Sequence, residues 1–294
     1  MSDLAAPTHV GLDTGVSPVR KLKDRAFTAA LWLCGGLAML PLLFISGYVI
    51  ARGLKAINLD FFFKTPGIPG QPGGGIEEAF IGTAIIVGIM AVIAVPLGIL
   101  TAVYLSEYGR GWFAATVRFV AEILLSTPSI VAGAFIWAVV VVRLGAFSGF
   151  AAALALSVLV WPIITRATEE VLRLVSHELR EGALALGVPR WKVILRIVIP
   201  TAGAGIFTAV MLALARGLGE TAPVLLTALG NTFVSTNPFG PMDSLSLRVY
   251  ADAQSSYSTD QAMAWAGAFC LLVIVLGLSI GARVISARQM RRTR

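Results

Sequence analysis

The sequence has little charge and few of the residues that build metal or redox sites. Charged residues make up 13% of the 294 positions and hydrophobic residues 57%, more apolar surface than a soluble domain of this size can bury. Only two cysteines and two histidines are present, and none falls in a CxxC or metal-ligand pattern. The chain has no G-x-x-x-x-G-K-[ST] and no Gly-Lys pair, so it carries no phosphate-loop nucleotide site. These absences predict an all-α membrane protein with no metal, no cofactor bound by this chain and no catalytic residues.

Long apolar runs predict six transmembrane helices, the first uncleaved because it is too long for a signal peptide. We place the spans at about 27–50, 80–105, 119–142, 147–165, 201–228 and 262–286, and we expect Pro128 to bend the third. Around this permease domain (27–287), with its cytoplasmic loop at 166–200, we expect a polar and basic cytoplasmic tail at 1–26, flexible over 1–19, and a basic cytoplasmic tail at 288–294.

The distribution of basic residues orients these spans. Most of the 23 Lys and Arg residues fall in segments that this topology places inside, which favours two cytoplasmic termini in a multi-pass plasma-membrane protein. The net charge of +7 then reflects contact with membrane lipid at the inner leaflet, and no nucleic acid is expected as a partner.

The segment from Glu181 to Pro200 is too polar to cross a bilayer, although apolar runs lie on both sides of it. Ser176 can cap a short helix, Gly187 can end it in a left-handed conformation, and Pro189 can start the next helix at its first position. We expect a short helix, a sharp bend, a second short helix, and Pro200 opening the fifth span. One flank of the first helix is slim enough to enter a partner's groove, because three of its residues are small: Gly182, Ala183 and Ala185.

The spacing of this segment resembles the EAA loop of importer-type ABC permeases, although a structured loop of any polytopic protein is the plain alternative. The family pattern is E-A-A, three residues, G, nine residues and I-x-L-P; here Glu181-Gly182-Ala183 precedes Gly187 and Ile197-Val198-Ile199-Pro200. Gly182 and Ile199 depart from the pattern without changing the class of side chain. The resemblance implies the type I ABC importer permease fold, with a coupling helix between the fourth and fifth spans. The residues that would meet a separate ATPase subunit are Glu181, Gly182, Ala183, Leu184, Ala185 and Gly187.

Two charges, Arg216 and Glu220, stand in the middle of the fifth predicted span at a helical i, i+4 spacing that lets them pair. Each costs about 2.5–3.5 kcal/mol at bilayer depth. Gly217 and Gly219 thin the helix and Pro223 disrupts its hydrogen bonding, which is tolerated where backbone lines a cavity. We interpret the pair as part of a pathway for an oxyanion, because a guanidinium offers paired donors. The alternative is an internal salt bridge without a transport role.

Further segments narrow the resemblance to the PstA-type permeases of bacterial phosphate importers, over about residues 70–285. They are Gly73-Gly74-Gly75-Ile76, Gly82-Thr83, Pro128-Ser129-Ile130-Val131, and Arg216 to Pro223. The resemblance implies that Arg216 and Glu220 are transport residues. It also implies a heterodimer with a PstC-type permease in the bacterial plasma membrane. Two PstB-type ATPase subunits would hold ATP and Mg inside, and a PstS-type phosphate-binding protein would dock outside.

Phosphate chemistry suits the charged pair. At neutral pH inorganic phosphate keeps at least one hydroxyl, so Arg216 can attract its charged oxygens while an ionised Glu220 accepts from the hydroxyl. Sulfate lacks that proton and would leave Glu220 facing a negative ligand. Three alternatives stay open: an ABC permease for sulfate, molybdate, an amino acid or another small solute; a stand-alone carrier or channel; and a structural or sensory subunit with no pathway.

Other polar residues in or near the spans have plainer interpretations. Glu122 fits either a cytoplasmic gate or a snorkelling charge. Three hydroxyl residues flank Pro128 and are expected to satisfy freed carbonyls rather than to line a pathway: Ser126, Thr127 and Ser129. Three aspartates are expected in a solvated outer loop rather than in contact with a binding protein: Asp243, Asp252 and Asp260.

Overall fold

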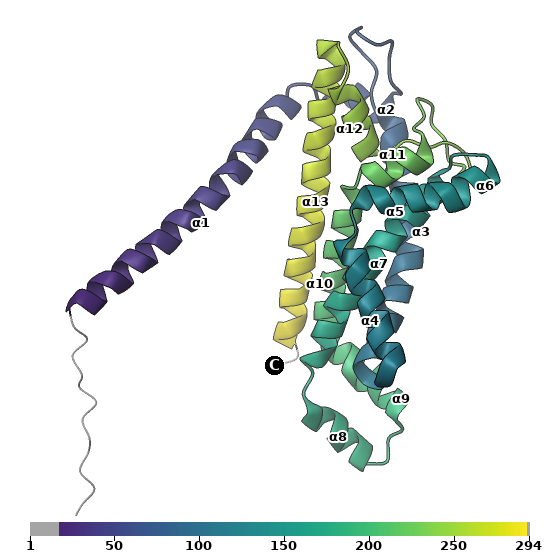
Figure 1. The fold of residues 1–294 in the computed structure, drawn as a ribbon. Coiled ribbons are helices and arrows are strands. Elements are labelled where there is room, and N and C mark those ends of the chain that lie inside the picture. The colour runs from purple at the N-terminus through teal and green to yellow at the C-terminus, as the bar shows by residue number, and fades with distance from the viewer. Residues whose placement is uncertain (1–17, 293–294) are drawn as a thin grey trace, which may run out of the picture. The chain divides into compact units, whose positions relative to one another are not determined.

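The computed structural model describes residues 18–292, with side chains to Arg288, so most of the predicted N-terminal tail lies outside the described residues. Every named element in this part of the chain is a helix or helical turn, joined by loops, which confirms the all-α prediction (Figure 1). The helices and π-helical turns (η) are α1 Pro18–Gly53, α2 Leu59–Phe63, α3 Glu77–Val103, η1 Tyr104–Tyr108, α4 Gly111–Ser126, α5 Ser129–Ile136, η2 Trp137–Val141, α6 Val142–Leu144, α7 Gly149–Arg173, α8 His177–Ala185, α9 Arg190–Val193, η3 Ile194–Val198, α10 Ile199–Leu218, α11 Ala222–Ala228, α12 Leu245–Ala253 and α13 Ser258–Arg292.

Five helical segments of the described chain are long and apolar enough to cross a membrane. A sixth span results if the bent pair α4 and α5–α6 crosses as one. Several helices extend past the predicted ends of the spans, since α1 begins at Pro18, α7 runs to Arg173 and α13 reaches Arg292. Polar residues at these ends continue the helical hydrogen bonding beyond the apolar stretch that hydropathy detects.

Two predicted spans are interrupted. The third breaks between Ser126 and Ser129, where the helix axis turns by 106°, so the predicted bend at Pro128 is confirmed and residues 119–142 are not one continuous helix. The fifth ends at Leu218 rather than at 228, and α11 follows with Pro223 in its first turn. In both places a proline restricts the backbone and removes a donor from the helical ladder.

The chain divides into two units, residues 1–48 and 49–294, and the second contains the packed bundle. Helices α3 and α7 pack along their lengths through small residues such as Ala94 and Ala152, which are fully buried. A Cβ added to Gly98 would lie 2.7 Å from the Ile164 side chain, so glycine permits the close approach. Close packing of small residues is one of the forces that associate helices in a bilayer, where lipid removes the hydrophobic driving force between them.

The connection between α11 and α13 is a folded layer rather than an open loop. It contains α12, which packs against α13 and the start of α3. The Leu245 N–H donates to Thr83 Oγ1 at 2.7 Å. The Asp243 carbonyl oxygen lies so near Gly82 that a Cβ there would be 2.0 Å away, so only glycine fits. The Gly82-Thr83 pair therefore joins this layer to α3.

Two of the three aspartates predicted in a solvated loop are buried, and the third, Asp260, lies in the first turn of α13, so that prediction was wrong. Asp243 and Asp252 are each 6% exposed, and Asp252 pairs with Arg248 at 3.0 Å. Asp260 is half-buried and accepts from the Gly70 N–H at 3.3 Å. Burial raises the pKa of Asp243 and the pKa of Asp252 to about 6, because desolvation outweighs the attraction of Arg248.

Candidate functional site

A cavity of about 200 Å³ lies where the two interrupted spans meet. It is lined from α4, the start of α5, α7 and the end of α10, by Leu124, Leu125, Thr127, Pro128, Ser129, Leu159, Ile163, Arg216 and Glu220. The structure thus brings the predicted charged pair together with the break at Pro128, about ninety positions away in the sequence. This juxtaposition makes the cavity the candidate substrate site.

The charged pair is looser than its spacing suggested. Arg216 lies in the last turn of α10, and Glu220 follows the helix in a turn whose amides bond back to the carbonyls of Arg216 and Gly217 (3.1 and 3.2 Å). The expectation that both lie on one continuous helix is therefore wrong. Arg216 Nε is 4.0 Å from Glu220 Oε1, and the two side chains are 67% and 23% exposed. The guanidinium retains donors for a ligand, because this long contact is the only ion pair that Arg216 makes within residues 18–288.

Helix ends add to the positive character of the cavity. Pro128 and Ser129 open α5, whose first amides have no partner within the helix and carry the positive end of its dipole. Helices α5 and α11 lie side by side across the bundle (Figure 1), and a Cβ added to Gly133 would come within 2.7 Å of Pro223 Cα. This contact holds the start of α5 beside the break after α10. A helix N-terminus next to an arginine favours an anion.

The hydroxyl residues around Pro128 have different roles. Ser126 and Thr127 donate to the carbonyls of Glu122 and Ile123 (3.0 and 2.7 Å), which confirms their predicted bonding to carbonyls. Thr127 also lines the cavity, as does Ser129, so the pathway role given less weight from the sequence has structural support there. The Glu122 side chain is exposed on α4 and does not reach this cavity.

The α8–α9 segment follows the predicted helix, bend and helix. Gly187 has the left-handed φ of 78° that was expected, while Pro189 precedes α9 as its cap instead of occupying the first position. Ser176 is the cap residue of α8, but its side chain makes no capping hydrogen bond. The second helix does not stop before Pro200: Arg190–Leu218 is one continuous helical segment through η3. A π-helical turn leaves backbone carbonyls unmatched, so the missing donor of Pro200 is tolerated.

The predicted ATPase-facing residues divide between two faces of this segment. Glu181, Gly182, Leu184, Ala185 and Gly187 are exposed, whereas Ala183 is buried against the bundle. The small residues therefore do not form one slim flank, because helical periodicity turns Ala183 inward.

Exposed leucines accompany these residues. The relative exposures of Leu179, Leu184 and Leu186 are 49%, 45% and 85%. This apolar surface, unused within the described chain, is suited to a protein partner.

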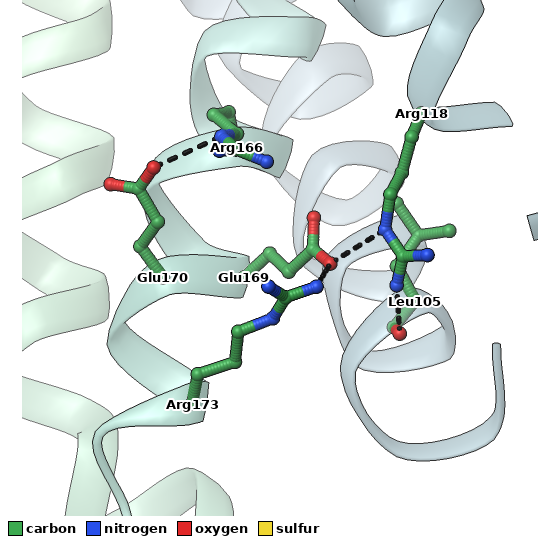
Figure 2. A network of polar contacts seen from close by, with 6 residues as sticks. All are labelled: Leu105, Arg118, Arg166, Glu169, Glu170 and Arg173. Atoms are coloured by element: carbon green, nitrogen blue, oxygen red, sulfur yellow. Dashed lines mark hydrogen bonds and ion pairs between the residues drawn. The ribbon is translucent and has the colours of Figure 1, made fainter. Parts of the chain in front are cut away.

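Sequence reasoning missed the buried ion pairs beside α8 and α9. Glu169 on α7 accepts from Arg118 Nε at 2.9 Å and from Arg173 Nη2 at 2.6 Å, with its side chain 2% exposed (Figure 2). Glu107 in η1 pairs with Arg180 of α8 at 2.9 Å. The i, i+4 spacing of Glu169 and Arg173 was the one available signal, because the other partners lie 51 and 73 positions apart.

A membrane bundle with broken spans around a cavity that holds charged side chains, together with an exposed helix–turn–helix, is the architecture of a transport permease. The model of the family described as "Binding-protein-dependent transport system inner membrane component" matches residues 94–291. Among solved structures, the alginate ABC transporter of a bacterium aligns with a TM-score of 0.61 at 17% identity, covering 92% of this chain and 98% of that one. The inward-facing MetNI methionine ABC transporter aligns at 0.55 and 21% identity, covering 73% and 94%. Both likenesses concern the fold, which is that of type I ABC importer permeases.

Curated relatives are closer in sequence. The phosphate transport system permease protein PstA of Xylella fastidiosa is 48% identical over 82% of this chain and 84% of its own length. PstA of Pasteurella multocida is 41% identical over 90% and 95%, and PstA 1 of Mycobacterium tuberculosis is 38% identical over 96% of both chains. The chain belongs to the binding-protein-dependent ABC permease family and, within it, to the PstA-type permeases.

Proposed function

We propose that this chain is the permease subunit of an ATP-driven importer that moves inorganic phosphate into the cell by alternating access. The cavity at Arg216 is the observation that carries the mechanism. Arg216 has donors free for the charged oxygens of phosphate, the start of α5 adds positive potential, and Glu220 can accept from the phosphate hydroxyl. The PstA relatives support phosphate over sulfate, molybdate or an amino acid as the substrate.

The exposed α8–α9 segment supports a second part of the proposal. Its leucines and Glu181 would enter a groove of a PstB-type ATPase at the cytoplasmic face, with both termini of the chain on that side. ATP and Mg would be held by two such subunits, and a PstC-type permease and a PstS-type phosphate-binding protein would complete the assembly. ATP binding would close the ATPase pair and open the cavity outward, and hydrolysis would release phosphate inward. The pathway site needs only weak affinity, because the ion must leave again.

Phosphate uptake by cells carrying Arg216→Gln tests the pathway role, with co-purification of the ATPase subunit as the check on assembly. We expect uptake to fall about tenfold or more with assembly intact, since a charge-assisted hydrogen bond contributes roughly 1.5–3 kcal/mol. Arg143→Gln, at an exposed position on α6, is the matched control and should leave uptake unchanged. Normal uptake by Arg216→Gln would show that Arg216 has a structural role and is not needed in the phosphate pathway.

Glu220→Gln tests the selectivity role separately. The amide keeps the shape of the side chain but can donate to a fully ionised anion. Phosphate uptake should fall and competition by sulfate should rise in this variant. An unchanged ratio of phosphate to sulfate competition would remove Glu220 from substrate selection and leave Arg216 unaffected.

A further inference from the structure

The π-helical turn η1 is held by arginines from three other helices. It continues α3 without a break, and the final carbonyls of a helical segment need partners from outside it. Arg118 of α4 donates to the Leu105 carbonyl at 2.7 Å (Figure 2), and Arg190 of α9 donates to the Glu107 carbonyl. Arg180 of α8 bonds the Glu107 carboxylate through Nε and Nη2, at 3.2 and 2.9 Å. We call Arg118, Arg180 and Arg190 the arginine clamp.

The clamp also reaches α7. Besides Glu107, Arg180 donates to the carbonyl of Leu172 in the last turn of α7 and to that of Val175 just beyond the helix (2.8 and 2.5 Å). Arg118 binds Glu169 of α7 at 2.9 Å as well as η1. Each of these two arginines therefore joins α3 to α7, the two helices that form the packed centre of the bundle. A planar guanidinium with five donors can bridge two acceptors in this way, and a lysine cannot reproduce the fork.

Apart from the clamp, α8 makes little apolar contact with the bundle. Ala183 is the one residue of α8 that is buried, and its side chain is a single methyl group. The side chains of Arg180 and Glu107 are 13% and 6% exposed, so their pairing is sheltered from water and is worth more than a surface ion pair. Removal of one partner would leave the other charge buried and unpaired. The clamp is thus the principal connection between α8 and the helices that line the core.

We propose that the arginine clamp makes α8, η1 and the end of α7 one rigid body, so that movement of α8 on the ATPase is transmitted to α3 and α7. Arg180 is then a positioning residue that couples ATP hydrolysis to transport, and it touches neither phosphate nor nucleotide. The role in transport rests on the proposed function. The connection of α8 to α3 and α7 rests on the observed contacts of the arginine clamp. Without the clamp, α8 would still dock but would shift relative to α3, so hydrolysis would continue with little movement of the spans.

The test uses the complete importer, expressed with its partner chains and reconstituted in lipid vesicles with its phosphate-binding protein. ATP hydrolysis and phosphate uptake are measured on the same preparation. Arg180→Gln should raise the number of ATP molecules hydrolysed per phosphate about tenfold. Glu107→Gln, which spares the bonds of Arg180 to carbonyls, should raise it less. Arg166→Gln is the matched control, because Arg166 forms an exposed pair with Glu170 on α7 at the same 2.9 Å and should change nothing (Figure 2).

A distance measurement separates transmission from simple stability. Spin labels at the exposed positions Glu178 of α8 and Leu97 of α3, with Cys34 and Cys270 replaced by serine, report how rigidly the two helices are joined. The wild-type distance should be narrow and the same with and without ATP, and Arg180→Gln should broaden it.

The outcomes separate the clamp from the proposed function. The clamp proposal would be overturned if Arg180→Gln hydrolysed as many ATP molecules per phosphate as the wild type and kept a narrow distance between the labels on α8 and α3. If Arg180→Gln does not assemble, the ATP-to-phosphate ratio and the label distance are measured in Arg180→Lys and Glu107→Gln, and wild-type values in both would overturn the clamp proposal. A wild-type importer that hydrolyses ATP without moving phosphate would overturn the proposed function, while the distances would still judge the clamp.

Discussion

The contact between α5 and α11 allows one substitution far from any charge to test how the substrate cavity is positioned. A Cβ in Gly133→Ala would lie 2.7 Å from Pro223 Cα and 3.4 Å from Leu226 Cδ1. Carbon atoms pack at about 3.5–4.0 Å, so α5 and α11 must separate by about 1 Å. Overpacking of this kind costs about 1–3 kcal/mol, and the higher helix propensity of alanine returns up to about 1 kcal/mol. The fold should therefore survive with a net loss of about 0–3 kcal/mol.

The effect on transport should be larger than the effect on stability. The α5 start and the break after α10 meet at the cavity, and a misplacement of about 1 Å can lower a rate on the order of a hundredfold. We expect initial phosphate uptake by Gly133→Ala to fall about 10- to 100-fold while thermal unfolding of the purified complex changes by a few degrees. Gly203→Ala on α10 is the control, because its added Cβ meets nothing within 4 Å. Equal uptake by the two variants would refute the idea that this contact positions the cavity.

Two further predictions concern the ends of the bundle. Because burial raises the pKa of Asp243 from 3.8 to about 6, the folded chain holds a proton that the unfolded chain releases between about pH 4 and 6. The free energy of unfolding should fall as pH rises through that window, by up to roughly 3 kcal/mol, and Asp243→Asn should flatten this part of a chemical-denaturation series; an identical pH profile in the variant would contradict it. Gly187→Ala places a β-carbon in a left-handed conformation at φ 78°, which costs about 1–2 kcal/mol, and should loosen the α8–α9 bend and weaken ATPase co-purification. Gly187→Asn, which tolerates that conformation better, should weaken co-purification less, and an equal loss in both variants would point to side-chain size instead.

Local patterns were sufficient for the helical class and for several backbone details. Uninterrupted apolar runs predicted the membrane helices, because the bilayer demands internally satisfied backbone groups. Pro128 predicted a bend and Gly187 a left-handed turn, since each residue restricts or permits φ by itself. The ends of spans were less predictable: helices continue into polar residues at Arg173, while α10 stops at Leu218 inside the fifth predicted span.

The sequence by itself determined the charges at 216 and 220, the exposed α8–α9 segment and the membrane class, because these follow from composition and from spacings of a few residues. Only the tertiary structure decided that Arg216 shares a cavity with Ser129 and that Glu107 is buried against Arg180. Those pairings join residues on different helices, and no local periodicity specifies which helix a charge will meet. They depend instead on glycine and alanine contacts that set how closely the helices approach, and on buried charges that are stable only with a partner.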